Sequence, residues 1–205
     1  MGVYLVSIGA REWFGEDESE GGYEDEEQAG FGELASALNG ELLRRGLPPF
    51  VSLPEAAPFV RGSGTAFEEK LSPPMDGFTE LCRAHLSREE TDTLCGWSAL
   101  VPISLDDEIC LPVECGYADE TVVAGAPQVL AIAERLARIL ELPPEIPAAS
   151  DNLDLTMWFL DGPAKDLAAA RPAPWGDDLD AAFYAALYLR AAQFVLRRGS
   201  PVVYS

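Results

Sequence analysis

The chain contains few positive charges for its size. Its 205 residues include 14 Lys and Arg against 35 Asp and Glu, which gives a formal net charge of −21 at pH 7. A protein that binds nucleic acid or an anionic membrane surface must present cations to the phosphates. The average field of this chain repels polyanions, so the sequence predicts neither nucleic acid nor a membrane as its partner.

Segments that direct secretion or membrane insertion are also missing. Residues 1–8 lack a positively charged start and are typical of a strand rather than of a signal peptide. The longest nearly apolar stretch, 181–196, is shorter than a bilayer span and contains Arg190 and Gln193. Four cysteines are too few for a disulfide scaffold in a chain of 205 residues. We therefore expect a cytoplasmic protein with reduced thiols.

Signatures of the common enzyme classes are absent from the sequence. It contains no Gly-x-Ser-x-Gly elbow, no His-Glu-x-x-His pair and no Walker loop for phosphates. The chain has one histidine, His85, which any histidine-based acid–base chemistry would have to use. The sequence thus favours a non-enzymatic protein and indicates no cofactor.

Thiols and a histidine could together hold a structural zinc ion. The available ligands are Cys82, His85, Cys95, Cys110 and Cys115. Zinc sites usually combine two closely spaced pairs, and this spacing matches no standard module. Buried cysteines and an ordinary histidine at a helix end explain these residues more simply.

Aspartates supply the alternative function. Carboxylates that converge in space can hold a divalent cation such as Mg²⁺, and six candidates flank an expected strand or begin an expected helix. They are Asp151, Asp154, Asp161, Asp177, Asp178 and Asp180. Helix capping and turns account for most of these positions without a metal. The alternative is a divalent-metal-dependent hydrolase that uses Asp151, Asp154, Asp161 and Asp178, with His85.

Hydrophobic patterning predicts one α+β domain over residues 1–205. Short apolar runs indicate strands at 3–8, 100–104, 108–113, 121–124 and 153–160, the middle three as an antiparallel meander. Apolar residues at helical spacing indicate helices near 34–45, 78–85, 87–97, 127–140 and 178–198. We expect a mixed or antiparallel sheet with helices packed on one side and an apolar C-terminal helix at the centre.

The final helix has the clearest end signals. Asp177 is the expected N-cap, Asp178 and Asp180 favour the positive end of the helix dipole, and Gly199 closes the other end. Its apolar residues cover two faces, which predicts a place in the core. A helix that completes a larger assembly would carry the same pattern.

Two segments differ from the rest in composition. Residues 48–77 carry six prolines together with Gly62 and Gly64, which indicates a long surface excursion with short elements. Residues 12–43 hold eleven acids and no Lys or Arg, and eight of these acids lie within 15–27. Such a run repels itself and stays solvated, so we expect an acidic loop at about 12–30.

Aromatic residues accompany the acids of this loop. Aromatic side chains contribute burial at binding hot spots, and carboxylates steer association with a basic partner. We expect Trp13 either to anchor a partner or to fill the core beneath the loop. The predicted partner-binding residues are Trp13, Phe14, Glu16, Asp17, Glu18, Glu20, Tyr23, Glu24, Asp25, Glu26 and Glu27. A loop that serves only solubility is the simpler interpretation of the same residues.

The sequence therefore predicts an acidic module that binds a basic protein partner. In composition the chain looks like small acidic immunity and antitoxin proteins, which mask the cationic site of a toxin. No motif carries this likeness, which is one of charge alone. Inhibition of the partner is the role that the likeness implies.

Overall fold

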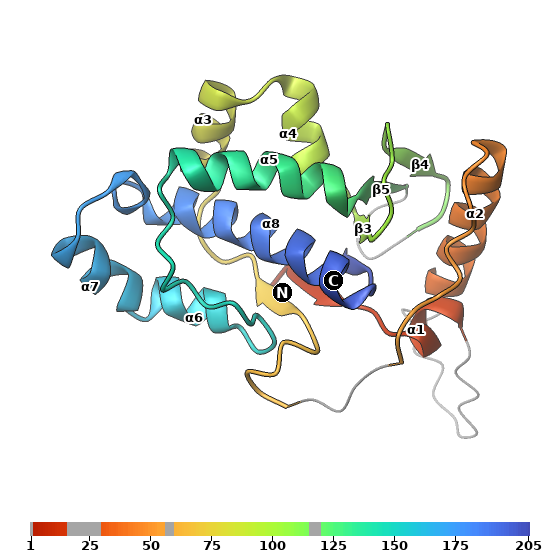
Figure 1. Ribbon diagram of the computed structural model, residues 1–205, viewed down its shortest axis with the longest axis horizontal. Helices are drawn as coiled ribbons and strands as arrows, with labels where there is room; N and C mark the ends of the chain where they lie inside the picture. Colours follow the sequence, from red (N-terminus) through yellow and green to blue (C-terminus); the bar gives the residue numbers. More distant parts are fainter. Residues whose placement is uncertain (1, 16–29, 56–59, 115–119) are drawn as a thin grey trace.

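Six short strands form one mixed sheet in the order β2-β1-β6-β3-β5-β4. The computed structural model describes residues 2–15, 30–55, 60–114 and 120–205 (Figure 1). The strands are β1 (Tyr4–Ser7), β2 (Glu68–Lys70), β3 (Ala99–Val101), β4 (Ile109–Leu111), β5 (Thr121–Gly125) and β6 (Val202–Tyr204). β3 and β5 run parallel, and the other neighbouring pairs run antiparallel.

Helices make up most of the remaining described chain and give an α+β fold. They are α1 (Ala10–Phe14), α2 (Gly30–Arg44), α3 (Asp76–His85), α4 (Arg88–Cys95), α5 (Ala126–Ile139), α6 (Asp154–Leu160), α7 (Pro163–Ala170) and α8 (Leu179–Arg198), with a 3-10 turn η1 (Pro174–Gly176). The five helices expected from apolar spacing are confirmed as α2, α3, α4, α5 and α8.

Helices cover both faces of the sheet. Successive side chains of a strand point to opposite faces. Leu100 and Val202 face a core shared with α5 and α8, whereas Val101 and Val203 face a second core beneath α1 and α2. In Figure 1, α2 accordingly lies on the far side of β4 and β5 from α8. The expected one-sided packing is wrong because the central strands are apolar on both faces and both must be covered.

The apolar C-terminal helix lies in the first core, as expected. α8 contacts α3, α5 and α6 (Figure 1). It is long and apolar enough to span a membrane, but 67% of that stretch is buried within the fold, and core helices satisfy the same criterion. Most of its apolar side chains are buried, whereas Leu196 near its C-terminal end is exposed.

The predicted strand at 153–160 is a helix. Leu155 and Phe159 of α6 are buried four residues apart, so the helical spacing places both on the core face. A short apolar run of this length is compatible with a strand or a helix. In this fold, packing against the core selects the helix.

The predicted meander has the wrong strand order. β5 lies between β3 and β4 and runs parallel to β3. Val123 and Ala124 of β5 are buried on opposite faces, whereas Cys110 of β4 is exposed. A strand that is apolar on both faces is stable in the interior of a sheet, and a strand with one exposed face suits the edge.

The N-cap of α8 is Asp178, one residue later than expected. Its carboxylate accepts a hydrogen bond from the Ala181 backbone N–H at 2.9 Å, whereas Asp177 is the C-cap of η1. We expect Asp178→Ala to lower the free energy of unfolding by about 1 kcal/mol. Asp177→Ala should change it by less than about 0.5 kcal/mol. Urea unfolding of both variants tests this, and equal losses would contradict the assignment.

Candidate functional site

The two described ends of the acidic segment meet at one place. Gly15 ends α1 with a φ of 68°, a left-handed conformation that favours glycine. A Cβ atom added to Gly32, in the first turn of α2, would lie 3.6 Å from the Cα of Gly15. The chain positions on either side of residues 16–29 therefore lie side by side. We call residues 10–15 and 30–34, which flank the eight acids of 16–27, the stem.

Trp13 fixes the stem to the second core. Its side chain has no exposed surface, and its ring meets the edge of Phe50 with 5.9 Å between the ring centroids. Leu34 and Leu38 of α2 belong to the same core. A side chain without exposed surface cannot contact a partner in this conformation. Of the two roles expected for Trp13, this burial supports core packing.

The other predicted partner-binding residues divide into two groups. Phe14 is half-buried at the end of α1 and packs partly against the second core. The remaining residues lie outside the described part of the chain: Glu16, Asp17, Glu18, Glu20, Tyr23, Glu24, Asp25, Glu26 and Glu27.

Charges on the stem are mostly negative. Glu12 and Glu33 are exposed, and the Glu12 carboxylate accepts the Gly9 backbone N–H at 2.8 Å at the start of α1. Arg11 is exposed on α1, and no Lys or Arg follows it until Arg44 at the end of α2. The stem therefore adds to the negative potential of the segment that it holds.

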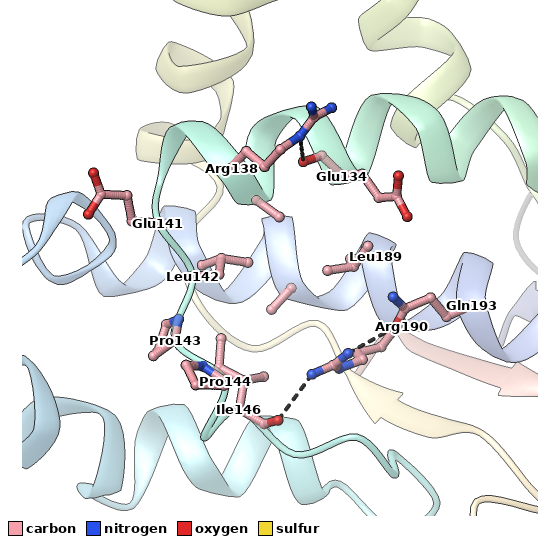
Figure 2. A pocket seen from close by; sticks show the side chains of 12 residues that line it. Glu134, Arg138, Glu141, Leu142, Pro143, Pro144, Ile146, Leu189, Arg190 and Gln193 are labelled. Atoms are coloured by element: carbon pink, nitrogen blue, oxygen red, sulfur yellow. Dashed lines mark hydrogen bonds between the residues drawn. The ribbon is translucent and has the colours of Figure 1, made fainter.

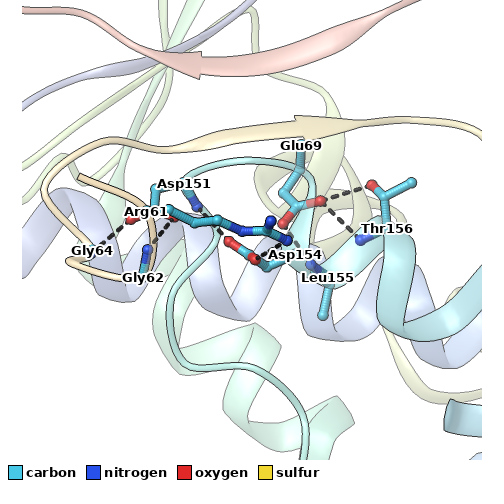
Figure 3. Close-up of polar contacts among 8 residues, drawn as sticks. All are labelled: Arg61, Gly62, Gly64, Glu69, Asp151, Asp154, Leu155 and Thr156. Carbon is cyan, nitrogen blue, oxygen red and sulfur yellow. Dashed lines mark hydrogen bonds and ion pairs between the residues drawn. The ribbon is translucent and has the colours of Figure 1, made fainter. Parts of the chain in front are cut away.

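Two aspartates of the alternative hydrolase, Asp151 and Asp154, accept hydrogen bonds from backbone N–H groups (Figure 3). Asp151 is buried and accepts the backbone N–H groups of Gly62 and Gly64, both at 3.0 Å. Burial by itself raises the pKa of Asp151, but these hydrogen bonds outweigh it and lower the pKa. Asp154 accepts the backbone N–H of Asp151 at 3.3 Å and lies 3.9 Å from the Arg61 guanidinium. Burial and the neighbouring Asp151 carboxylate raise the pKa of Asp154.

The predicted metal site is not assembled. Asp178 caps α8, Asp161 is exposed at the end of α6, and His85 is exposed at the end of α3. In the described ranges, no three His, Cys, Asp or Glu side chains are grouped where they could hold a metal ion. Asp151, Asp154, Asp161, Asp178 and His85 therefore do not form the carboxylate cleft on which the hydrolase depends.

The cysteines do not gather around His85 either. Cys82 is buried, Cys95 is half-buried and Cys110 is exposed on β4, while Cys115 lies outside the described residues. Burial raises the pKa of Cys82 to about 12 and that of Cys95 to about 11. Such thiols stay protonated at neutral pH.

Glu69 is a buried carboxylate that the sequence did not reveal. It accepts the backbone N–H of Leu155 at 2.7 Å, that of Thr156 at 2.9 Å and the Thr156 hydroxyl at 2.7 Å (Figure 3). Burial raises its pKa, and these hydrogen bonds offset only part of the increase. The N-cap residue of α6 is Leu153, which has no polar side chain to cap the helix. Glu69 of β2, 86 positions before Leu155, accepts hydrogen bonds from the start of the helix instead.

A cavity of about 560 Å³ lies between α5, α8 and the loop that follows α5 (Figure 2). Apolar side chains form most of its wall, and five polar ones line the rest. The apolar residues are Ala137, Leu142, Pro143, Pro144, Ile146, Ala186 and Leu189. The polar residues are Glu134, Arg138, Glu141, Arg190 and Gln193. This size and this mixture are typical of sites for small ligands.

The chain matches no protein-family model, no curated protein and no solved structure.

Proposed function

We propose that this protein is an acidic binding module whose segment of eight acids at 16–27 engages a basic protein partner. The observation that carries the proposal is the stem. Eight acids without an intervening cation are joined to the fold at one place. The base of that stem is fixed by the buried ring of Trp13.

Concentrated negative charge favours association with a cationic surface. Clustered charges of one sign steer an oppositely charged partner and raise its association rate by about 10- to 1000-fold, an effect that salt weakens. Carboxylates also repel negatively charged proteins, which makes binding more specific for a basic partner. Phe14 and Phe31, both half-buried on the stem, offer apolar area next to these charges. A cytoplasmic inhibitor that masks a cationic site is the form of binding module that this chemistry suits best.

Two variants with the same net charge separate a local effect from a global one. In the segment variant, the eight acids within 16–27 become Gln or Asn. In the control variant, eight exposed acids elsewhere are neutralised in the same way: Glu80, Glu89, Asp106, Asp107, Glu114, Glu120, Asp161 and Asp166. Each variant loses eight negative charges, which changes the net charge from −21 to −13.

We expect only the segment variant to lose its partner. Proteins retained from the native host lysate at low and moderate salt are identified first, and the association rate of the purified partner is then measured. The segment variant should bind about 10- to 100-fold more slowly, with a weaker dependence on salt, while the control variant keeps most of its rate. Equal rates for the two variants would show that only net charge matters and would overturn the proposal.

A further inference from the structure

The cavity between α5 and α8 contains a positive charge without a negative partner (Figure 2). Arg190 is half-buried on α8. Its Nε donates to the Pro147 carbonyl at 2.9 Å, one Nη to the Ile146 carbonyl at 3.1 Å and the other Nη to Gln193 Oε1 at 2.8 Å. All three acceptors are neutral. Among the described residues no carboxylate forms an ion pair with Arg190.

This arrangement leaves part of the guanidinium available to a ligand. Arginine has five N–H donors and stays charged in proteins, so three hydrogen bonds to neutral oxygens leave two donors free to bind a ligand or water. Burial lowers the pKa of Arg190, and the nearby cation of Arg197 lowers it further, because both disfavour the charged form. The chain has 35 acids, yet Arg190 is bound only by neutral oxygens. Its guanidinium can therefore bind the carboxylate of a ligand.

The wall beside this cation is apolar. Ala186 and Leu189 lie on the same helix as Arg190, Ala137 lines the cavity from α5, and Ile146 lines it from the loop that follows α5. A volume of about 560 Å³ accepts a ligand of moderate size, and its burial against these side chains would be favourable.

We propose that this cavity binds a small carboxylic acid with an apolar body. The carboxylate lies on the Arg190 guanidinium, where a charge-assisted pair can form, and the apolar body lies against α5 and α8. Glu134 and Glu141 also line the cavity, and the net charge of −21 repels free anions. A bare anion therefore gains too little from Arg190, and the apolar body supplies the rest. The site shares no residue with the stem, so this inference does not depend on the proposed function.

Titration calorimetry of the full chain with four probes tests both parts of the ligand. Octanoate carries the carboxylate and the apolar body, 1-octanol and octylamine keep the body but change the head, and acetate keeps only the head. We expect saturable binding of octanoate at one site, with each of the other probes about tenfold weaker or more. No saturable binding of octanoate, or equal binding of octanol or octylamine, would overturn the proposal.

Variants identify the residues responsible. Arg190→Gln should weaken octanoate binding by about 10- to 100-fold, as the loss of a hydrogen bond to a charged group does. The matched control is Arg88→Gln, because Arg88 is exposed on α4 and does not line this cavity. It should bind octanoate almost as the unaltered chain does.

A second kind of variant keeps the experiment decisive if the loop depends on Arg190 for folding. Ala137→Phe fills the cavity and leaves the guanidinium in place. It should abolish octanoate binding while circular dichroism and the unfolding curve stay close to those of the unaltered chain. Undiminished binding to a folded Ala137→Phe chain would place octanoate elsewhere and overturn the assignment.

Discussion

Replacing Trp13 with alanine is expected to lower the free energy of unfolding by about 3–5 kcal/mol, as measured by urea unfolding. The indole has no exposed surface and fills the second core between α1 and α2, where its ring meets Phe50. Alanine would leave a cavity that a close-packed interior refills only in part. The loss should be large because α1 has five residues and depends on this side chain for its attachment.

Trp13→Phe is the matched control. It keeps an aromatic ring against Phe50 and removes the indole Nε1, which is buried without a hydrogen-bond partner in the described part of the chain. We expect it to lose less than half as much stability as Trp13→Ala, and to bind the partner at an unchanged rate. A Trp13→Ala chain of normal stability that no longer binds would instead make Trp13 a contact residue.

Local signals in the sequence were sufficient for the long helices. In α2, Leu34, Leu38 and Leu42 recur on one face and are all buried. In α5, Pro127 stands at the first turn and an apolar stripe faces α8. Each such helix carries its own start, period and stop, so its position follows from residues that are close in the sequence.

Short elements could not be predicted in this way. β6 consists of Val202–Tyr204, yet it lies between β1 and β3 near the middle of the sheet. Three apolar residues give no usable period, and their place is decided by partners about one and two hundred positions away. The same limit explains α6, whose cap comes from β2.

The candidate sites also differ in whether the sequence alone could predict them. The acidic segment at 16–27 can be recognised in the sequence because charge is a property of composition. The cavity is not, because Ala137, Ile146 and Arg190 become neighbours only when α5 packs on α8. Trp13 lies between these cases, since aromatic residues beside acids fit a binding anchor or a core equally well, and only its burial decides.

Glu69 is the position where substitution should have the other large effect on stability. We expect Glu69→Leu to lower the free energy of unfolding by about 3–5 kcal/mol, because two backbone N–H groups and the Thr156 hydroxyl lose their acceptor inside the fold. Glu69→Gln keeps one acceptor oxygen and should lose about 1–3 kcal/mol. Exposed Glu68 on the same strand supplies the control, and Glu68→Gln should change stability by less than about 0.5 kcal/mol.

The pH dependence of the unfolding free energy of these variants tests whether burial raises the pKa of Glu69. Burial raises the pKa of Glu69 in the folded chain above its ordinary value of 4.5, so the folded state binds the proton more tightly than the unfolded state. Stability from this group therefore increases as the pH falls through the folded pKa, and is complete below 4.5. Glu69→Gln lacks this titration, whereas Glu68→Gln retains it.

Chemical unfolding at a series of pH values then isolates one carboxyl from the other acids of the chain. The difference in unfolding free energy between the unaltered chain and Glu69→Gln should grow as the pH falls toward 4.5, and the difference from Glu68→Gln should not follow this curve. A difference that shrinks on acidification would mean that the hydrogen bonds from α6 outweigh burial and lower the pKa. Glu69 would then resemble Asp151, where two backbone N–H groups have that effect on a carboxylate that is also buried.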